Sequence, residues 1–114
     1  MIRTNLHVTT NAGGTQHALE LPGPLRRMRL RRSNNLSSRW SWVDGAVTNS
    51  TPDGGSIVIP SGDWFDTGWL EQPARPLYFA SEQPGAAFRL QVWTAEILET
   101  DFAFSYGFQI AFEA

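Results

Sequence analysis

The sequence contains neither cysteine nor lysine, and it has no long hydrophobic run. Without cysteine, the fold cannot rely on disulfides or on a thiolate metal site. No apolar stretch approaches the roughly 18 residues that a membrane-spanning helix needs. The first residues also lack the basic and apolar segments of a Sec-type signal. We therefore expect a protein that is synthesised in a cytoplasm, is not exported by the Sec route and does not insert into a membrane.

All nine basic residues are arginine, and the formal net charge is −2. Five of the arginines lie between residues 26 and 32, whereas the acidic residues are concentrated after Asp44. The net charge argues against a general nucleic-acid binder. Arginine favours fixed, forked contacts with carboxylates, although codon usage in GC-rich DNA explains the absence of lysine equally well. Five tryptophans and seven phenylalanines are many for 114 residues and suit an interface.

Short stretches of alternating apolar and polar residues recur along the chain, separated by turn signals. This pattern predicts one all-β domain over residues 1–114, an antiparallel β-sandwich or jelly roll of eight or nine strands. The first two strands are expected to pair as a hairpin across the turn at residues 11–14. Residues 57–59 are expected to form a short buried strand. The expected strands lie around residues 2–8, 19–21, 25–32, 39–43, 57–59, 77–80, 88–93 and 102–112.

The last stretch of the chain carries a large apolar residue at every second position. These residues are Phe102, Phe104, Tyr106, Phe108, Ile110 and Phe112. In a strand they would share one face, and fully burying each is worth about 1.5–3 kcal/mol. We expect that face to be covered by the sandwich itself or by a partner, including a second copy paired along the strand edge. Phe104, Tyr106, Phe108 and Phe112 are therefore candidate partner-binding residues, and we expect a homo-oligomer.

Residues 25–32 predict a strand with an unusual outer face. Met28 and Leu30 point to one side, while Arg27, Arg29 and Arg31 point to the other. Three arginines on one face repel one another unless carboxylates, phosphates or solvent stand opposite. The face is either a solvated outer surface or a docking surface for an acidic partner protein. Phosphates of a nucleic acid are a third interpretation, but binding them usually needs a wider basic field than one strand.

The sequence carries no recognised catalytic motif: it has no nucleophile elbow, phosphate loop or dinucleotide fingerprint. His7 and His17 could in principle bind zinc together with Glu20, but a third ligand at motif spacing is missing, so surface imidazoles are the better interpretation. Asp63 and Asp66 flank an aromatic corner, and residues three apart in a turn more often cap the turn than form an acid–base pair. We therefore expect no catalytic residue, metal or cofactor, and no enzymatic activity.

The five tryptophans could include a flat platform for sugar rings, or they could fill the core or an interface. Trp93 has the opposite parity to Phe88, Leu90 and Val92, so it faces away from the expected core. We expect it to be the exposed one, serving as an anchor if a partner covers it and as a ligand platform if it stays open. The five are Trp40, Trp42, Trp64, Trp69 and Trp93.

The middle of the chain contains the segments IVIPSGDWF at 57–65, PLYFAS at 76–81, PGAA at 84–87 and LQVWT at 90–94. Together these four segments resemble a pattern in small virion proteins of tailed bacteriophages. In that pattern an IPxG corner leads, through a tryptophan-bearing segment, to an LYFAS strand and then to a strand ending in Val-x-Trp. The resemblance covers about residues 57–94 and excludes both the arginine-rich strand and the terminal strand.

The resemblance implies a non-enzymatic structural component of a virion, synthesised in the host cytoplasm. A capsid decoration or cement protein that binds the major capsid protein is the leading expectation, and a neck or tail subunit is the alternative. A carbohydrate- or receptor-binding sandwich is an alternative from a different class. In the leading interpretation, Arg27, Arg29 and Arg31 dock on acidic patches, while Trp93 and the terminal strand make apolar contacts.

Overall fold

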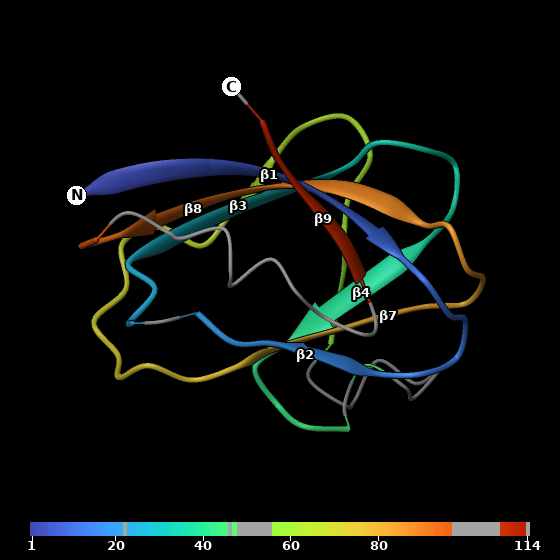
Figure 1. Cartoon of the computed structure of the whole chain (residues 1–114), viewed down its shortest axis with the longest axis horizontal. Coiled ribbons are helices and arrows are strands. Elements are labelled where there is room, and N and C mark those ends of the chain that lie inside the picture. The colour runs from blue at the N-terminus through green and yellow to red at the C-terminus, as the bar shows by residue number, and fades with distance from the viewer. Residues whose placement is uncertain (22, 46, 48–55, 97–107, 114) are drawn as a thin grey trace.

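The structure is a computed structural model, which describes residues 1–21, 23–45, 47, 56–96 and 108–113. These residues contain nine β-strands and no α-helix (Figure 1). Accordingly, the described ranges include no helix that is long and apolar enough to cross a membrane. The strands are β1 (Ile2–Thr10), β2 (His17–Leu19), β3 (Arg27–Arg32), β4 (Ser38–Ser41), β5 (Ile57–Val58), β6 (Phe65–Asp66), β7 (Leu77–Ser81), β8 (Ala87–Thr94) and β9 (Phe108–Glu113).

The strands form two sheets that face each other across the core. The five-stranded sheet has the order β6-β3-β8-β1-β9, and the four-stranded sheet has the order β2-β7-β4-β5. All described strand pairs are antiparallel. Figure 1 shows β1, β3 and β8 in one layer and β2, β4 and β7 in the other. The expected antiparallel β-sandwich of about nine strands is confirmed.

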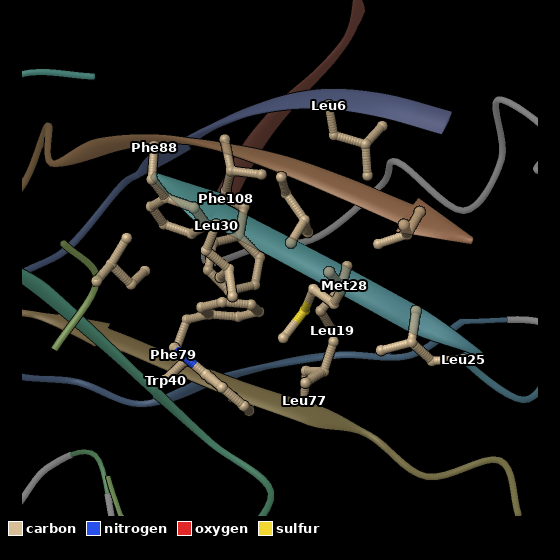
Figure 2. Packing of buried hydrophobic residues seen from close by; sticks show 14 residues of the cluster. Leu6, Leu19, Leu25, Met28, Leu30, Trp40, Leu77, Phe79, Phe88 and Phe108 are labelled. Carbon is tan, nitrogen blue, oxygen red and sulfur yellow. The ribbon is translucent and has the colours of Figure 1, made fainter. Parts of the chain in front are cut away.

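The core lies between the sheets because alternate residues of each strand turn inward. Phe79 of β7 connects the layers: its ring stacks on Phe88 at 5.1 Å and meets Phe108 edge-on at 5.7 Å, centroid to centroid. Figure 2 shows these three rings packed together between the strands. The buried hydrophobic cluster comprises Leu6, Val8, Leu19, Leu25, Met28, Leu30, Trp40, Ile59, Leu77, Phe79, Phe88, Leu90, Val92 and Phe108.

The expected hairpin between the first two strands is wrong, because they belong to different sheets. β1 pairs with β8 and β9, whereas β2 pairs with β7. The turn at residues 11–14 passes from one layer to the other and runs against the end of β7. There the Gly14 amide donates to the Ser81 carbonyl at 2.7 Å. A Cβ on Gly13 would lie 2.5 Å from the Glu82 carbonyl oxygen, so this close approach requires glycine.

The described part of the terminal strand, β9, turns its large residues toward the core side of the sheet. Phe108 is buried and Ile110 is half-buried against the core, but Phe112 is 40% exposed. The sandwich itself therefore covers this face incompletely at Phe112, and covering of that ring by a partner stays a prediction. The physical reason is that β9 is an edge strand with β1 as its neighbour on one side only. Phe102, Phe104 and Tyr106 lie outside the described residues.

Residues 57–59 do not form the buried strand that their apolar composition predicts. β5 contains only Ile57 and Val58, and both side chains are exposed, whereas Ile59 is fully buried. β5 lies at the edge of the four-stranded sheet, next to β4, so its side chains have few neighbours to pack against.

Candidate functional site

The outer face of the five-stranded sheet gathers arginines and tryptophans from several strands. Residues that pair across antiparallel strands share a face, and the register aligns Arg27 with Trp93 and Arg3, and Arg31 with Arg89 and His7. We call this surface the arginine–tryptophan face. It comprises Arg3, Asn5, His7, Arg27, Arg29, Arg31, Trp64, Asp66, Trp69, Arg89, Gln91, Trp93 and Glu113.

Two neighbouring tryptophans hold the first arginine of β3. The Arg27 guanidinium carbon lies 5.3 Å from the Trp69 ring centroid and 5.0 Å from that of Trp93. The two rings meet edge-on at 6.4 Å. Trp69 is 63% exposed, and Trp93 is half-buried beneath its neighbours. The two ring faces attract the guanidinium, so Arg27 keeps a defined orientation.

A single tryptophan contacts both of the other outward arginines of β3. The guanidinium carbons of Arg29 and Arg31 lie 5.1 and 5.0 Å from the Trp64 ring centroid. Arg29 also donates from Nη1 to the Gln91 side-chain oxygen at 3.3 Å. These contacts reduce the number of rotamers open to both guanidiniums. The contacts therefore order both arginines in part.

Asp66 of β6 neutralises part of the charge on this face. Its carboxylate accepts hydrogen bonds from Arg27 Nε at 3.0 Å and from Arg27 Nη2, and Arg29 Nε lies 3.8 Å from Oδ2. The Gly68 amide also donates to Oδ1 at 2.8 Å. The hydrogen bond from Arg27, helped by Gly68 and the two positive charges, lowers the pKa of Asp66 to about 2. The same pairing raises the pKa of Arg27.

We expect the ion pair between Asp66 and Arg27 to make the free energy of unfolding depend on pH in the acidic range. The folded-state pKa of Asp66 lies below its ordinary value of 3.8, so the carboxylate stabilises the fold above about pH 4 and this stabilisation is lost as the pH falls toward 2. The side chain is 32% exposed, so screening limits the effect to about 0.2–1 kcal/mol. Urea unfolding measures this dependence: between pH 5 and pH 2, the free energy of unfolding should fall less steeply for Asp66→Asn than for the wild type.

Asp63→Asn is the matched control for this measurement, because Asp63 forms no ion pair with a described residue. The free energy of unfolding of Asp63→Asn should fall with decreasing pH as steeply as that of the wild type. Equal slopes for all three proteins would show that the Asp66 pair does not contribute.

The arginine–tryptophan face retains positive charge after these pairings. Arg89 Nε lies 3.4 Å from the Glu113 carboxylate, whereas Arg3 and Arg31 form no ion pair with a described residue. The face therefore contains five arginines but only two carboxylates among the described residues. Because the whole chain carries a net charge of −2, positive charge is concentrated on one side of an acidic protein.

The structure brings the predicted arginines together with Trp93 but separates them from the terminal rings. Phe108 packs into the core and Phe112 lies on the core side of β9, so neither belongs to the arginine–tryptophan face. Phe104 and Tyr106 lie outside the described residues. The expectation that Trp93 is the most exposed tryptophan is wrong, because Arg27 and Trp69 lie against it. Trp69 takes that place.

Sequence reasoning misses Trp64, Asp66 and Arg89 as parts of this face. It predicts that Asp66 caps its turn, which the bond from the Gly68 amide confirms, but the pairing of Asp66 with Arg27 depends on contacts between distant strands. The signal in the sequence is the segment 64–69, in which two tryptophans flank an aspartate at positions compatible with an edge strand.

The other candidate groups are separated from one another. His7 lies on β1 with Nε2 2.9 Å from the Ser33 hydroxyl, while His17 lies on β2 with its ring edge-on to Phe108 at 5.6 Å. Residues 1–21, 23–45, 47, 56–96 and 108–113 contain no group of three or more His, Asp or Glu side chains that could hold a metal ion. Trp40 is buried in the core.

The arginine–tryptophan face can bind oxyanions through guanidinium donors and apolar groups through indole rings. Arginine and tryptophan are among the residues most enriched at the energetic anchors of protein interfaces. Comparison of the chain with protein-family models, curated proteins and solved structures finds no match.

Proposed function

We propose that this chain is a non-enzymatic docking protein that binds an acidic partner protein through its arginine–tryptophan face. The observation that carries the proposal is the excess of arginine on a face where indole rings already hold the guanidiniums. Three of the five arginines contact a tryptophan ring at 5.0–5.3 Å. Side chains ordered in advance lose less conformational entropy on binding, and arginine pairs with carboxylates in a fixed fork geometry.

The setting we propose is the virion of a tailed phage, where the chain decorates and cements the capsid. The resemblance of residues 57–94 to small virion proteins supports this setting, and that segment supplies Trp64, Trp69 and Trp93 to the face. Acidic patches of the major capsid protein would be the partner surface. A neck or tail subunit is the alternative position in the particle, and synthesis in the host cytoplasm would precede assembly.

A carbohydrate- or receptor-binding role is a second candidate, favoured by the 63% exposure of Trp69. An open indole face can stack on a sugar ring. Binding to a glycan array that is lost in Trp69→Ala and retained in Arg29→Glu would favour this role over protein docking.

The docking proposal predicts a charge-specific loss of binding. We expect Arg29→Glu to raise the dissociation constant for stripped capsids and for immobilised poly-L-glutamate by about tenfold, equivalent to about 1.4 kcal/mol. Binding of the wild type should weaken as salt rises from about 0.05 to about 0.5 M, because the Debye screening length falls from about 14 Å to about 4 Å over this range. Surface plasmon resonance measures both effects.

Arg75→Glu is the matched control, because it changes the net charge identically but lies against Trp42, beside the four-stranded sheet. It should bind nearly as the wild type does. Arg29→Gln is a milder variant in case glutamate next to Asp66 disturbs the fold, and circular dichroism verifies folding. Equal weakening by Arg29→Glu and Arg75→Glu would contradict docking through this face.

A further inference from the structure

Two arginines of the face lie directly opposite each other. The register of β3 and β8 pairs Arg31 with Arg89, and both side chains project from the same side of the sheet. Like charges directly opposite in neighbouring strands destabilise a sheet. Glu113 approaches Arg89 at 3.4 Å, while Arg31 leans on the Trp64 ring and forms no ion pair with a described residue. The pair therefore retains one positive charge in excess.

A hollow of about 190 Å³ opens beside this pair. Trp64, Arg89 of β8 and Glu113 of β9 are among the residues that line it. Asn5 of β1 and Gln91 of β8, which pair across the two strands, also line it. The volume is below the roughly 300–1,000 Å³ typical of pockets for drug-sized ligands. The hollow therefore suits one inserted side chain better than a cofactor.

We propose that this hollow receives one carboxylate side chain, aspartate or glutamate, of the acidic partner. The inference rests on the proposed docking function and identifies the part of the face that would bind the partner specifically. Arg31 and Arg89 carry two positive charges and Glu113 carries one negative charge, so one positive charge is not neutralised. A carboxylate of the partner would neutralise it, and Arg89 can bind that carboxylate through a charge-assisted hydrogen bond.

The same charge balance disfavours the other occupants. A phosphate group carries close to two negative charges, which would exceed the single excess charge and be repelled by Glu113. A neutral sugar would leave the repulsion between Arg31 and Arg89 unrelieved. The indole of Trp64 supplies an apolar wall for the methylene groups of an acidic side chain.

A titration of the full chain followed by NMR tests the hollow. The probes are an N-acetylated, C-amidated hexapeptide of glutamate, the same peptide of glutamine, and inorganic phosphate. We expect only the glutamate peptide to shift the Trp64 indole N–H and the Arg31 and Arg89 Nε–H resonances. Arg89→Gln should raise the dissociation constant for that peptide by about tenfold or more.

Arg3→Gln is the matched control, since it removes one positive charge from the same face at a residue that does not line the hollow. It should raise the dissociation constant by less than about threefold, as is typical of rim charges. Arg31→Gln is a second test variant, because it breaks no described ion pair. Arg31 does not line the hollow, but it lies directly opposite Arg89 and against Trp64, which do, so its loss should weaken binding more than Arg3→Gln does.

The outcomes separate the hollow from the wider proposal. If the glutamate peptide binds and Arg89→Gln, Arg31→Gln and Arg3→Gln weaken its binding equally, the proposed role of the hollow is wrong. The proposal of docking through the face then stands. If neither the peptide nor poly-L-glutamate binds, the proposed function fails as well. Phosphate or the glutamine peptide binding as tightly as the glutamate peptide would overturn the carboxylate specificity.

Discussion

Replacing Phe79 with alanine is expected to lower the free energy of unfolding by about 3–5 kcal/mol. The ring is fully buried and contacts Phe88 and Phe108 of the opposite sheet. Its removal leaves a cavity at the point where the two layers meet, and the surrounding strands can close it only in part. Because a domain of this size has about 5–15 kcal/mol of stability in total, the variant would lose a large share of its stability at 37 °C.

Equilibrium urea unfolding monitored by tryptophan fluorescence measures this loss. Phe112→Ala provides the control, since that ring is 40% exposed on the edge strand and its removal should cost less than about 1.5 kcal/mol. A loss at Phe79 no larger than the loss at Phe112 would mean that the packing between the sheets is not what stabilises the fold.

Replacing Thr10 with valine is expected to cost about 1–3 kcal/mol, although the two side chains have nearly the same shape. The Thr10 hydroxyl lies 2.8 Å from the Ser81 hydroxyl and accepts a hydrogen bond from the Ala86 amide at 3.1 Å. Thr10 is buried on β1, and Ser81 is buried at the end of β7 in the other sheet. Valine would leave a buried amide and a buried hydroxyl with fewer partners, which is costly away from water.

Thermal and urea unfolding of Thr10→Val should be compared with Thr9→Val, the half-buried neighbour on the opposite face of the strand. Thr9→Val should change the free energy of unfolding by about 0.5 kcal/mol or less, as is usual for surface substitutions. Ser81→Ala should reproduce most of the loss, because Ser81 also donates to the Gln83 carbonyl at 2.7 Å. Comparable stability of Thr10→Val and the wild type would argue against a polar link between the sheets at this end.

The sequence predicts the class of fold and the two faces of β3 because both depend on local alternation. Met28 and Leu30 are fully buried, and Arg27, Arg29 and Arg31 lie on the outer face, as the two-residue period requires. The same period predicts that β8 turns Trp93 outward. Alternation tells which side a residue faces, and in these strands that is sufficient.

Alternation does not tell which strands become neighbours, and the wrong predictions arise from this limit. The proximity of His17 to β1 in sequence favours a hairpin, but β2 pairs with β7, whose first residue is Leu77. The exposure of Trp93 is wrongly predicted because Trp69 comes from a different segment and lies against it. Likewise, the pairing of Arg27 with Asp66 depends on the register between β3 and β6, which no local pattern in the sequence determines.

The position of β1 between β8 and β9 has a consequence for how the chain acquires its structure. Residues 2–10 leave the ribosome before their partners, residues 87–94 and 108–113. The five-stranded sheet therefore cannot close until most of the chain is made, and long loops must be ordered before these contacts form. Until then the apolar side of β1 stays unprotected, which makes the nascent chain dependent on fast completion or on chaperones.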